Sequence, residues 1–291
     1  MNFLAKNLRG TGVAVVTPFN EDFSIDTESI IRLVDFLIEN GVDYIVVQGT
    51  TGESSTLNKS EKNLSRTAFV NANKGRVPMI LGLGSNDTLS IVNDLRSSQF
   101  SGFSAILSVT PFYNKPSQNG LYKHYSAISK ASPLPIILYN VPSRTGVNML
   151  AKTTIEIASN HSNIIGIKEA CGDLNQVKQL IEKRPKDFMI ISGDDETAVK
   201  TVLLGGDGVI SVAAGCIPKY FTEIIRLALN KNEDLSQKKL NQIQLLLKLL
   251  FAEGNPSGIK SALSSMNLCK NVLRLPLTKV GKDLDLNKKK T

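Results

Sequence analysis

The chain has 291 residues, enough for one large domain or for one domain with an appended segment. Apolar residues make up 42% of the chain and charged residues 21%, which is typical of a globular protein. The formal net charge is +8, but no basic stripe alternates with aromatic residues and tryptophan is absent. The composition therefore argues against nucleic-acid binding. No apolar run approaches the ~20 residues that span a membrane.

The cysteines and the first residues bear on the compartment. Residues 1–6 contain no apolar stretch of the kind found in signal peptides. Cys171, Cys216 and Cys269 are far apart and odd in number, which predicts neither a disulfide framework nor a zinc site. We therefore expect a cytoplasmic protein.

Apolar runs and helix-like stretches alternate along the first part of the chain. Helix starts are predicted near Thr27, Ser60 and Ser117, where polar capping residues precede apolar residues at helical spacing. The predicted strands are residues 13–16, 44–47, 79–81, 103–107, 135–138, 164–167, 188–191 and 208–212. Repeated strand–helix units of similar size predict a (β/α)₈ TIM barrel over residues 1–231. A doubly wound open sheet is the alternative, and closure is favoured because it leaves no sheet edge.

The alternation stops at about residue 230. Residues 240–251 predict one helix with apolar side chains on nearly all sides, and a second short helix follows Pro256. So much apolar surface requires burial against the barrel or against another subunit. We therefore expect residues 232–291 to form a C-terminal helical appendage rather than an independent domain.

A lysine stands where the sixth strand should end. Lys168 follows the apolar run 164–167 and precedes Glu169. Burial disfavours the charged form of a lysine, and the neutral amine can attack a carbonyl to form a Schiff base. Taken alone, the heptapeptide favours the simpler reading, in which Lys168 pairs with Glu169 or extends to the surface.

Other polar side chains follow the ends of other predicted strands, where active sites of such barrels lie. They are Thr17, Thr50, Thr51, Glu53, Thr110, Tyr113, Tyr139, Arg144 and Ser192. The two histidines, His124 and His161, fall in the stretches between the predicted strands. The strand ends therefore lack the histidine that a catalytic triad or a histidine-rich metal centre would need. No glycine-rich phosphate motif is complete. The remaining groups suit a Schiff-base lyase or aldolase with no cofactor and no metal.

Several motifs, in this order, resemble the signatures of the dihydrodipicolinate synthase family, within the class I pyruvate lyases that include N-acetylneuraminate lyase. The resemblance runs nearly end to end. The motifs are Gly49-Thr50-Thr51-Gly52-Glu53-Ser54, Val109-Thr110-Pro111-Phe112-Tyr113-Asn114-Lys115-Pro116, Tyr139-Asn140-Val141-Pro142-Ser143-Arg144-Thr145-Gly146, Gly166-Ile167-Lys168-Glu169, Ser192-Gly193-Asp194-Asp195, Gly208-Val209-Ile210-Ser211 and Asn255-Pro256.

The resemblance implies condensation of pyruvate with L-aspartate 4-semialdehyde, the committed step of diaminopimelate and lysine biosynthesis. It implies that Lys168 forms the imine with pyruvate and that Tyr139 transfers protons, with Thr50 and Tyr113 relaying them. Thr51 would hold the pyruvate carboxylate and Arg144 the semialdehyde carboxylate.

The resemblance also implies that Gly193 and Ile210 present backbone carbonyls near the substrates. It implies that Tyr113 reaches a neighbouring subunit's site in a homo-oligomer, usually a tetramer. Read without the family, each of these residues could instead be an ordinary packing, capping or surface residue.

Two alternatives remain: a related aldolase such as an N-acetylneuraminate lyase, and a non-catalytic small-molecule sensor on the same barrel. The Thr50-Thr51 pair and Arg144 favour the synthase. The chain departs from lysine-inhibited members, whose inhibitor site is lined by a histidine pair, a glutamate and a tyrosine. The corresponding positions are Lys59, Lys62, Ser90 and Phe112, whereas Ser54, Ser55 and Asn86 remain compatible. We expect weak or absent inhibition by lysine.

Overall fold

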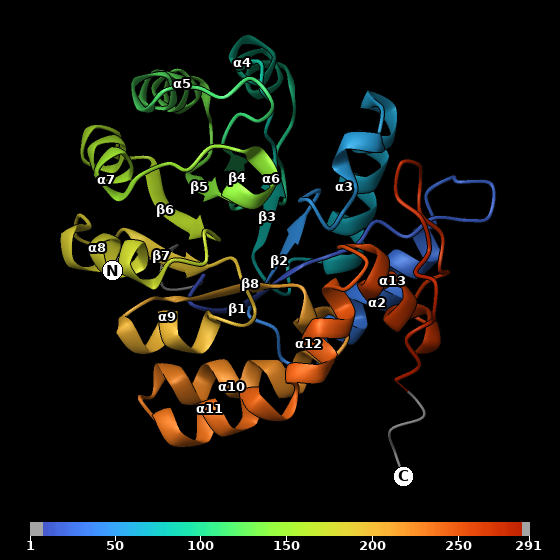
Figure 1. Cartoon of the computed structure of the whole chain (residues 1–291). Helices are drawn as coiled ribbons and strands as arrows, with labels where there is room; N and C mark the ends of the chain where they lie inside the picture. Colours follow the sequence, from blue (N-terminus) through green and yellow to red (C-terminus); the bar gives the residue numbers. More distant parts are fainter. Residues whose placement is uncertain (1–7, 287–291) are drawn as a thin grey trace.

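A closed barrel of eight parallel strands is the centre of the molecule in the computed structural model, which describes residues 8–286 (Figure 1). The strands follow one another around the barrel in chain order, and β8 pairs back to β1. They are β1 (Gly10–Ala14), β2 (Tyr44–Val47), β3 (Met79–Gly82), β4 (Ala105–Val109), β5 (Ile136–Asn140), β6 (Ile164–Glu169), β7 (Met189–Ser192) and β8 (Gly208–Ser211). The predicted (β/α)₈ barrel is confirmed.

The first strand begins at Gly10, not at Val13 as the apolar pattern predicted. Two glycines hid its start. A Cβ atom on Gly12 would lie 2.1 Å from the Tyr44 ring, so glycine is needed where this large side chain fills the barrel. Glycine adds nothing to an apolar pattern, and the sequence signal therefore began too late.

Helices surround the barrel (Figure 1). Capping side chains fix where several begin: Asp26 accepts from Ser29 N at the first, Asn58 forms a capping box with Glu61, and Ser117 accepts from Gly120 N. The helices are α2 (Thr27–Glu39), α3 (Lys59–Asn73), α4 (Thr88–Ser97), α5 (Gln118–Ala131), α6 (Pro142–Thr145), α7 (Ala151–Asn160), α8 (Leu174–Lys183), α9 (Ala198–Leu204) and α10 (Pro218–Leu229), with short 3₁₀ turns η1 (Ser54–Thr56) and η2 (Ala213–Gly215). Within residues 8–286 no helix is both long and apolar enough to cross a membrane.

Apolar side chains form two layers. The larger layer fills the space between strands and helices, and the smaller one fills the inside of the barrel. Inward-pointing residues of the smaller layer include Val46, Ile80, Ile137, Met189 and Ile210. The barrel is therefore a packed core that closes the bottom of any cavity at its mouth.

The C-terminal appendage contains three helices, α11 (Glu233–Gln242), α12 (Gln244–Phe251) and α13 (Ser257–Ser265). The prediction of one helix over residues 240–251 is wrong, because the helix breaks at Ile243. A straight helix can bury only one side, whereas the break lets α11 pack on α10 and α12 pack on α13. The division at residue 231, which falls in the turn between α10 and α11, stays a prediction.

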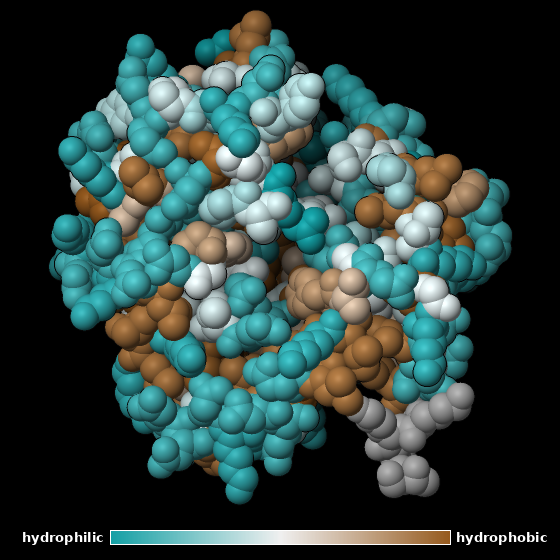
Figure 2. Space-filling model, in the orientation of Figure 1, coloured by the Kyte–Doolittle hydropathy of each residue, from teal (hydrophilic) through white to brown (hydrophobic). Residues whose placement is uncertain are grey.

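The break does not bury all the apolar residues of α12. Leu247 and Leu250 are buried, but Leu245 is 57% exposed, and Leu249 and Phe251 are each 40% exposed. Figure 2 shows hydrophobic side chains on the surface in this region, beside the hollow over the barrel. One end of this surface, at Phe251, reaches the functional site described next.

Candidate active site

Lys168 lies at the carboxyl end of the barrel, next to last in β6. It pairs in register with Tyr139 of β5 and Ile191 of β7. Its side chain is 6% exposed, and its Nζ lies 4.4 Å from the centre of the Tyr139 ring. Register between neighbouring parallel strands thus brings together the amine and the phenol that the sequence singled out.

The neighbouring carboxylate points to the other face of the strand, as consecutive strand residues must. Glu169 accepts hydrogen bonds from Asn140 Nδ2 at 2.9 Å, from Gln176 Nε2 at 3.0 Å and from the Cys171 N–H at 2.9 Å. Burial raises the pKa of the Glu169 carboxyl above its usual value. Its partners are thus polar neutral groups, and the alternative of a Lys168–Glu169 ion pair is wrong.

Gly193 makes room for the lysine arm. A Cβ atom at this position would lie 3.0 Å from Lys168 Cε, 3.1 Å from Lys168 Cγ and 2.7 Å from Ala170 Cβ. A larger residue would therefore require Ala170, the lysine side chain or both to shift. This steric requirement was not found from the sequence, which had suggested only a backbone role for Gly193.

The turn after β2 carries Thr50 and Thr51. Gln48 and Glu53, at its two ends, have left-handed φ values of 57° and 49°, a conformation that costs about 1–2 kcal/mol for residues other than glycine. Side-chain contacts hold the first of them, because Gln48 donates to Lys62 O and accepts from Arg66 Nε. Strain held in this way indicates a turn that is fixed in position.

The turn leaves donors free at the mouth of the barrel. Gly52 N–H and Glu53 N–H donate back to Gly49 O and Thr50 O. Within residues 8–286, the backbone N–H groups of Thr50 and Thr51 have no protein acceptor. Adjacent free N–H groups of this kind form a site for an anion.

These residues line one cavity of about 180 Å³, which we call the Lys168 cavity. The side chains of Thr51 and Lys168 are buried in its wall, whereas Thr50 and Arg144 are exposed at its edge. Its residues come from the barrel and from the appendage: they include Gly49, Thr50, Thr51, Tyr139, Val141, Arg144, Lys168, Ala170, Gly193, Phe251 and Asn255. An amine, a phenol, a hydroxyl and a guanidinium thus converge on a space large enough for a small keto acid.

A second cavity of about 420 Å³, the Phe112 cavity, shares Thr50, Tyr139 and Arg144 with the first. It also includes Ser54, Ser55, Lys62 and Phe112. Lys62 therefore brings a positive charge into this space. Lys59 and Ser90 are exposed and do not line it.

Two predicted site residues do not line the Lys168 cavity. Ile210 is 1% exposed and belongs to the inner layer of the barrel, while Val212 lines the cavity instead. Tyr113 is 85% exposed, with a left-handed φ of 70°. The roles suggested for both residues stay predictions.

Two further residues of the cavity were given no role from the sequence. Phe251 and Asn255 belong to the appendage, more than eighty residues after Lys168. Asn255 was visible as half of an Asn-Pro motif, but nothing local to that motif indicates that it lies beside Thr51. Its Nδ2 donates to Thr51 Oγ1 at 3.0 Å.

Comparison with known proteins identifies the family of the chain. The model of the dihydrodipicolinate synthetase family matches residues 7–291. The chain is 49% identical over 279 residues to a 4-hydroxy-tetrahydrodipicolinate synthase of Flavobacterium psychrophilum, covering 94% of each chain.

Solved structures give the same result. A dihydrodipicolinate synthase of Acinetobacter baumannii, chloride-inhibited and complexed with pyruvate, has 42% identity and a TM-score of 0.91, with 94% of each chain covered. A monomeric dihydrodipicolinate synthase variant has 40% identity and a TM-score of 0.92, covering 96% of this chain and 93% of the other. The chain belongs to the dihydrodipicolinate synthetase family.

Proposed function

We propose that the chain is a lyase of the class I aldolase type that condenses pyruvate with L-aspartate 4-semialdehyde, a 4-hydroxy-tetrahydrodipicolinate synthase in diaminopimelate and lysine biosynthesis. One observation carries the proposal. The Lys168 amine is buried at a strand end, against Tyr139 and beside the free donors of the Thr50–Thr51 turn. A keto acid needs this combination, namely an amine for its carbonyl and hydrogen-bond donors for its carboxylate.

The first half of the reaction makes a carbon nucleophile. The Lys168 amine adds to the ketone carbon of pyruvate, and loss of water leaves a protonated imine. Its positive charge draws electrons from the neighbouring bond, so the methyl group loses a proton and an enamine forms. Tyr139, whose ring lies against Nζ, is placed to take and return protons, with Thr50 and Tyr113 as the proposed relay.

In the second half, the enamine carbon attacks the aldehyde carbon of the semialdehyde, and the aldehyde oxygen takes up a proton. Arg144 is placed to bind the semialdehyde carboxylate, because it lies at the edge of both cavities and its guanidinium can donate two parallel hydrogen bonds. The semialdehyde amine then attacks the imine carbon, which closes the ring and releases the lysine.

Borohydride trapping tests the proposal. The protein is incubated with pyruvate and borohydride, and the modified peptide is identified by mass spectrometry, with Lys168→Ala as control. The expected result is a reduced pyruvate adduct on Lys168 that is absent from the variant. A coupled condensation assay is run beside an assay of N-acetylneuraminate cleavage. An unmodified Lys168 indicates a sensor, and cleavage without condensation indicates the related aldolase; either result would refute the proposal.

We also propose a homo-oligomer, a tetramer built from dimers, in which Tyr113 completes the site of a neighbouring subunit. Its 85% exposure, outside the Lys168 cavity of its own chain, supports this. Lys168→Ala and Tyr113→Phe chains are mixed after reversible dissociation. A hybrid dimer would contain one site with Lys168 from one chain and Tyr113 from the other. Activity should then exceed the sum of the separate variants, and simple additivity contradicts the proposal.

A further inference from the structure

The appendage supplies one polar side chain to the Lys168 cavity. Asn255 lies between α12 and α13, is 7% exposed, and shares the cavity with Lys168 and Thr51. Its Nδ2 donates to Thr51 Oγ1, whereas its Oδ1 is buried and has no partner within residues 8–286. The Asn255 amide is thus buried with its nitrogen bonded and its oxygen without a partner, which points to a role at the cavity.

The direction of this hydrogen bond decides what Thr51 can do. A threonine hydroxyl has one hydrogen and two lone pairs. Because the Asn255 amide donates into a lone pair, the Thr51 hydrogen remains available to an acceptor in the cavity. Donation to the hydroxyl oxygen also polarises it, which strengthens the hydrogen bond that the hydroxyl itself donates.

An ion pair connects the segment that carries Asn255 to the turn that carries Thr51. The Lys260 ammonium of α13 is fully buried, lies 2.5 Å from Glu53 Oε1 and donates to Val272 O at 2.7 Å. Burial lowers the pKa of Lys260 below its usual value, and the nearby Glu53 carboxylate opposes this shift. Glu53 is the last residue of the turn that carries Thr51, so the ion pair joins α13 to the turn.

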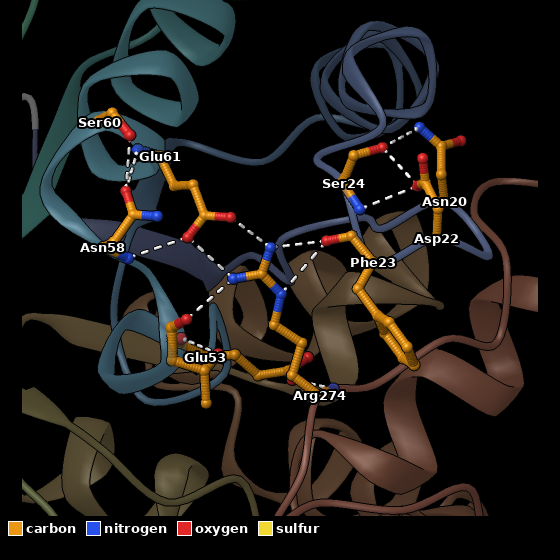
Figure 3. A network of polar contacts seen from close by, with 10 residues as sticks. Asn20, Asp22, Phe23, Ser24, Glu53, Asn58, Ser60, Glu61 and Arg274 are labelled. Atoms are coloured by element: carbon orange, nitrogen blue, oxygen red, sulfur yellow. Dashed lines mark hydrogen bonds and ion pairs between the residues drawn. The ribbon is translucent and has the colours of Figure 1, made fainter.

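Arg274 makes a second connection to the same turn (Figure 3). The Arg274 backbone N–H donates to Glu53 Oε2 at 3.1 Å, and its guanidinium forms two hydrogen bonds with the Glu61 carboxylate. The guanidinium also donates to Phe23 O. Two segments more than two hundred residues apart are therefore held in one fixed geometry at the Asn255–Thr51 contact.

We propose that Asn255 is a positioning residue that aims the Thr51 hydroxyl hydrogen at the carboxylate of the bound keto acid. The inference rests on the proposed function, and it makes the appendage part of the substrate site. It predicts that loss of Asn255 weakens the binding of pyruvate while leaving the chemistry of the bound imine largely intact.

Steady-state kinetics and the pyruvate dependence of borohydride trapping test this inference. Asn255→Ala should raise the KM for pyruvate about tenfold, because a charge-assisted hydrogen bond is weakened. The kcat should stay within about threefold, and the KM for the semialdehyde should not change. An unchanged KM for pyruvate would overturn the inference.

A double-mutant cycle separates this role from a general loosening of the site. Thr51→Val should raise the KM for pyruvate further, and adding Asn255→Ala to it should change little, because Asn255 acts through Thr51. If the two substitutions instead raised the KM for pyruvate by independent factors, the inference would be contradicted.

Asn255→Asp keeps the shape of the side chain, but its carboxylate can only accept a hydrogen bond from Thr51. The Thr51 hydrogen then points away from the substrate, and a negative charge is added, so this variant should bind pyruvate more weakly than Asn255→Ala. Asn255→Asp binding as tightly as the wild type would also overturn the inference, and it covers the case in which the alanine variant does not fold.

Ser261→Ala is the matched control. Ser261 lies on α13, donates to Asp283 and accepts from the Leu284 N–H, so its loss perturbs the appendage away from the cavity. The KM for pyruvate should be unchanged in this variant. An increase equal to that of Asn255→Ala would show general loosening and refute the proposal. Failure of the function itself looks different, because wild-type protein would then form no adduct on Lys168 at any pyruvate concentration.

Discussion

Substitution of Gly193 by alanine tests whether the path of the lysine arm limits catalysis. The added Cβ would lie 2.7 Å from Ala170 Cβ and 3.0 Å from Lys168 Cε, closer than ordinary van der Waals contact. Overpacking of this kind costs typically about 1–3 kcal/mol. If the lysine side chain moves to relieve the contact, the same free energy is lost from the reactive geometry. Each 1.36 kcal/mol is tenfold in rate, so trapping should slow by about 5–150-fold.

The assay measures two quantities on the same protein. The rate of borohydride trapping with pyruvate reports the position of the amine, and urea unfolding reports stability. We expect slower trapping together with a loss of stability of about 1–3 kcal/mol, because the lysine side chain can move but the closer contact, with Ala170 Cβ, is fixed to the backbone.

Gly120→Ala is the control. Gly120 lies in α5, outside the Lys168 cavity, and its alanine variant should trap pyruvate at the wild-type rate. Wild-type trapping and wild-type stability in Gly193→Ala would together refute the steric reasoning. Lost stability with unchanged trapping would show that the barrel, and not the lysine arm, absorbs the contact.

Three other predictions concern proton transfer, pH and inhibition. Tyr139→Phe should slow the condensation by roughly 10²–10⁴-fold in single-turnover measurements, as expected for a positioned acid–base group; an unchanged rate removes Tyr139 from the mechanism. Burial lowers the pKa of His124 from 6.5 to about 4, so below pH 6.5 the unfolded state binds a proton that the folded state does not, and about 3 kcal/mol of stability is lost as the pH falls from 6.5 to 4. His124→Gln should lose less stability than the wild type in urea unfolding at pH 7 and 4, and equal losses contradict the assignment. Sub-millimolar L-lysine should leave activity unchanged, because the Lys62 ammonium lines the Phe112 cavity and repels a cation there; inhibition in that range would refute this.

The sequence predicted the barrel well because its signals are local. Most strands are short apolar runs, and several helices begin at a polar capping residue, so these signals can be recognised from neighbouring residues alone. The prediction failed where a signal was not local. Gly10 and Gly12 hid the start of β1, and the break at Ile243 arises because α11 and α12 pack on different partners.

For the site, the sequence alone determined which residue types stand at the strand ends. Barrel closure and strand register then brought Thr51, Tyr139 and Lys168 to one cavity. Ile210 and Tyr113 do not line that cavity, and the roles proposed for them stay predictions.

Only the tertiary structure decided which parts of the chain surround the amine. The Asn255–Thr51 hydrogen bond and the Glu53–Lys260 ion pair each join segments about two hundred residues apart. Nothing in either segment's own sequence encodes the partner, because such contacts depend on how the appendage docks on the finished barrel. The close approach of the Lys168 side chain to Gly193 has the same origin, because it exists only once β6 and β7 lie side by side.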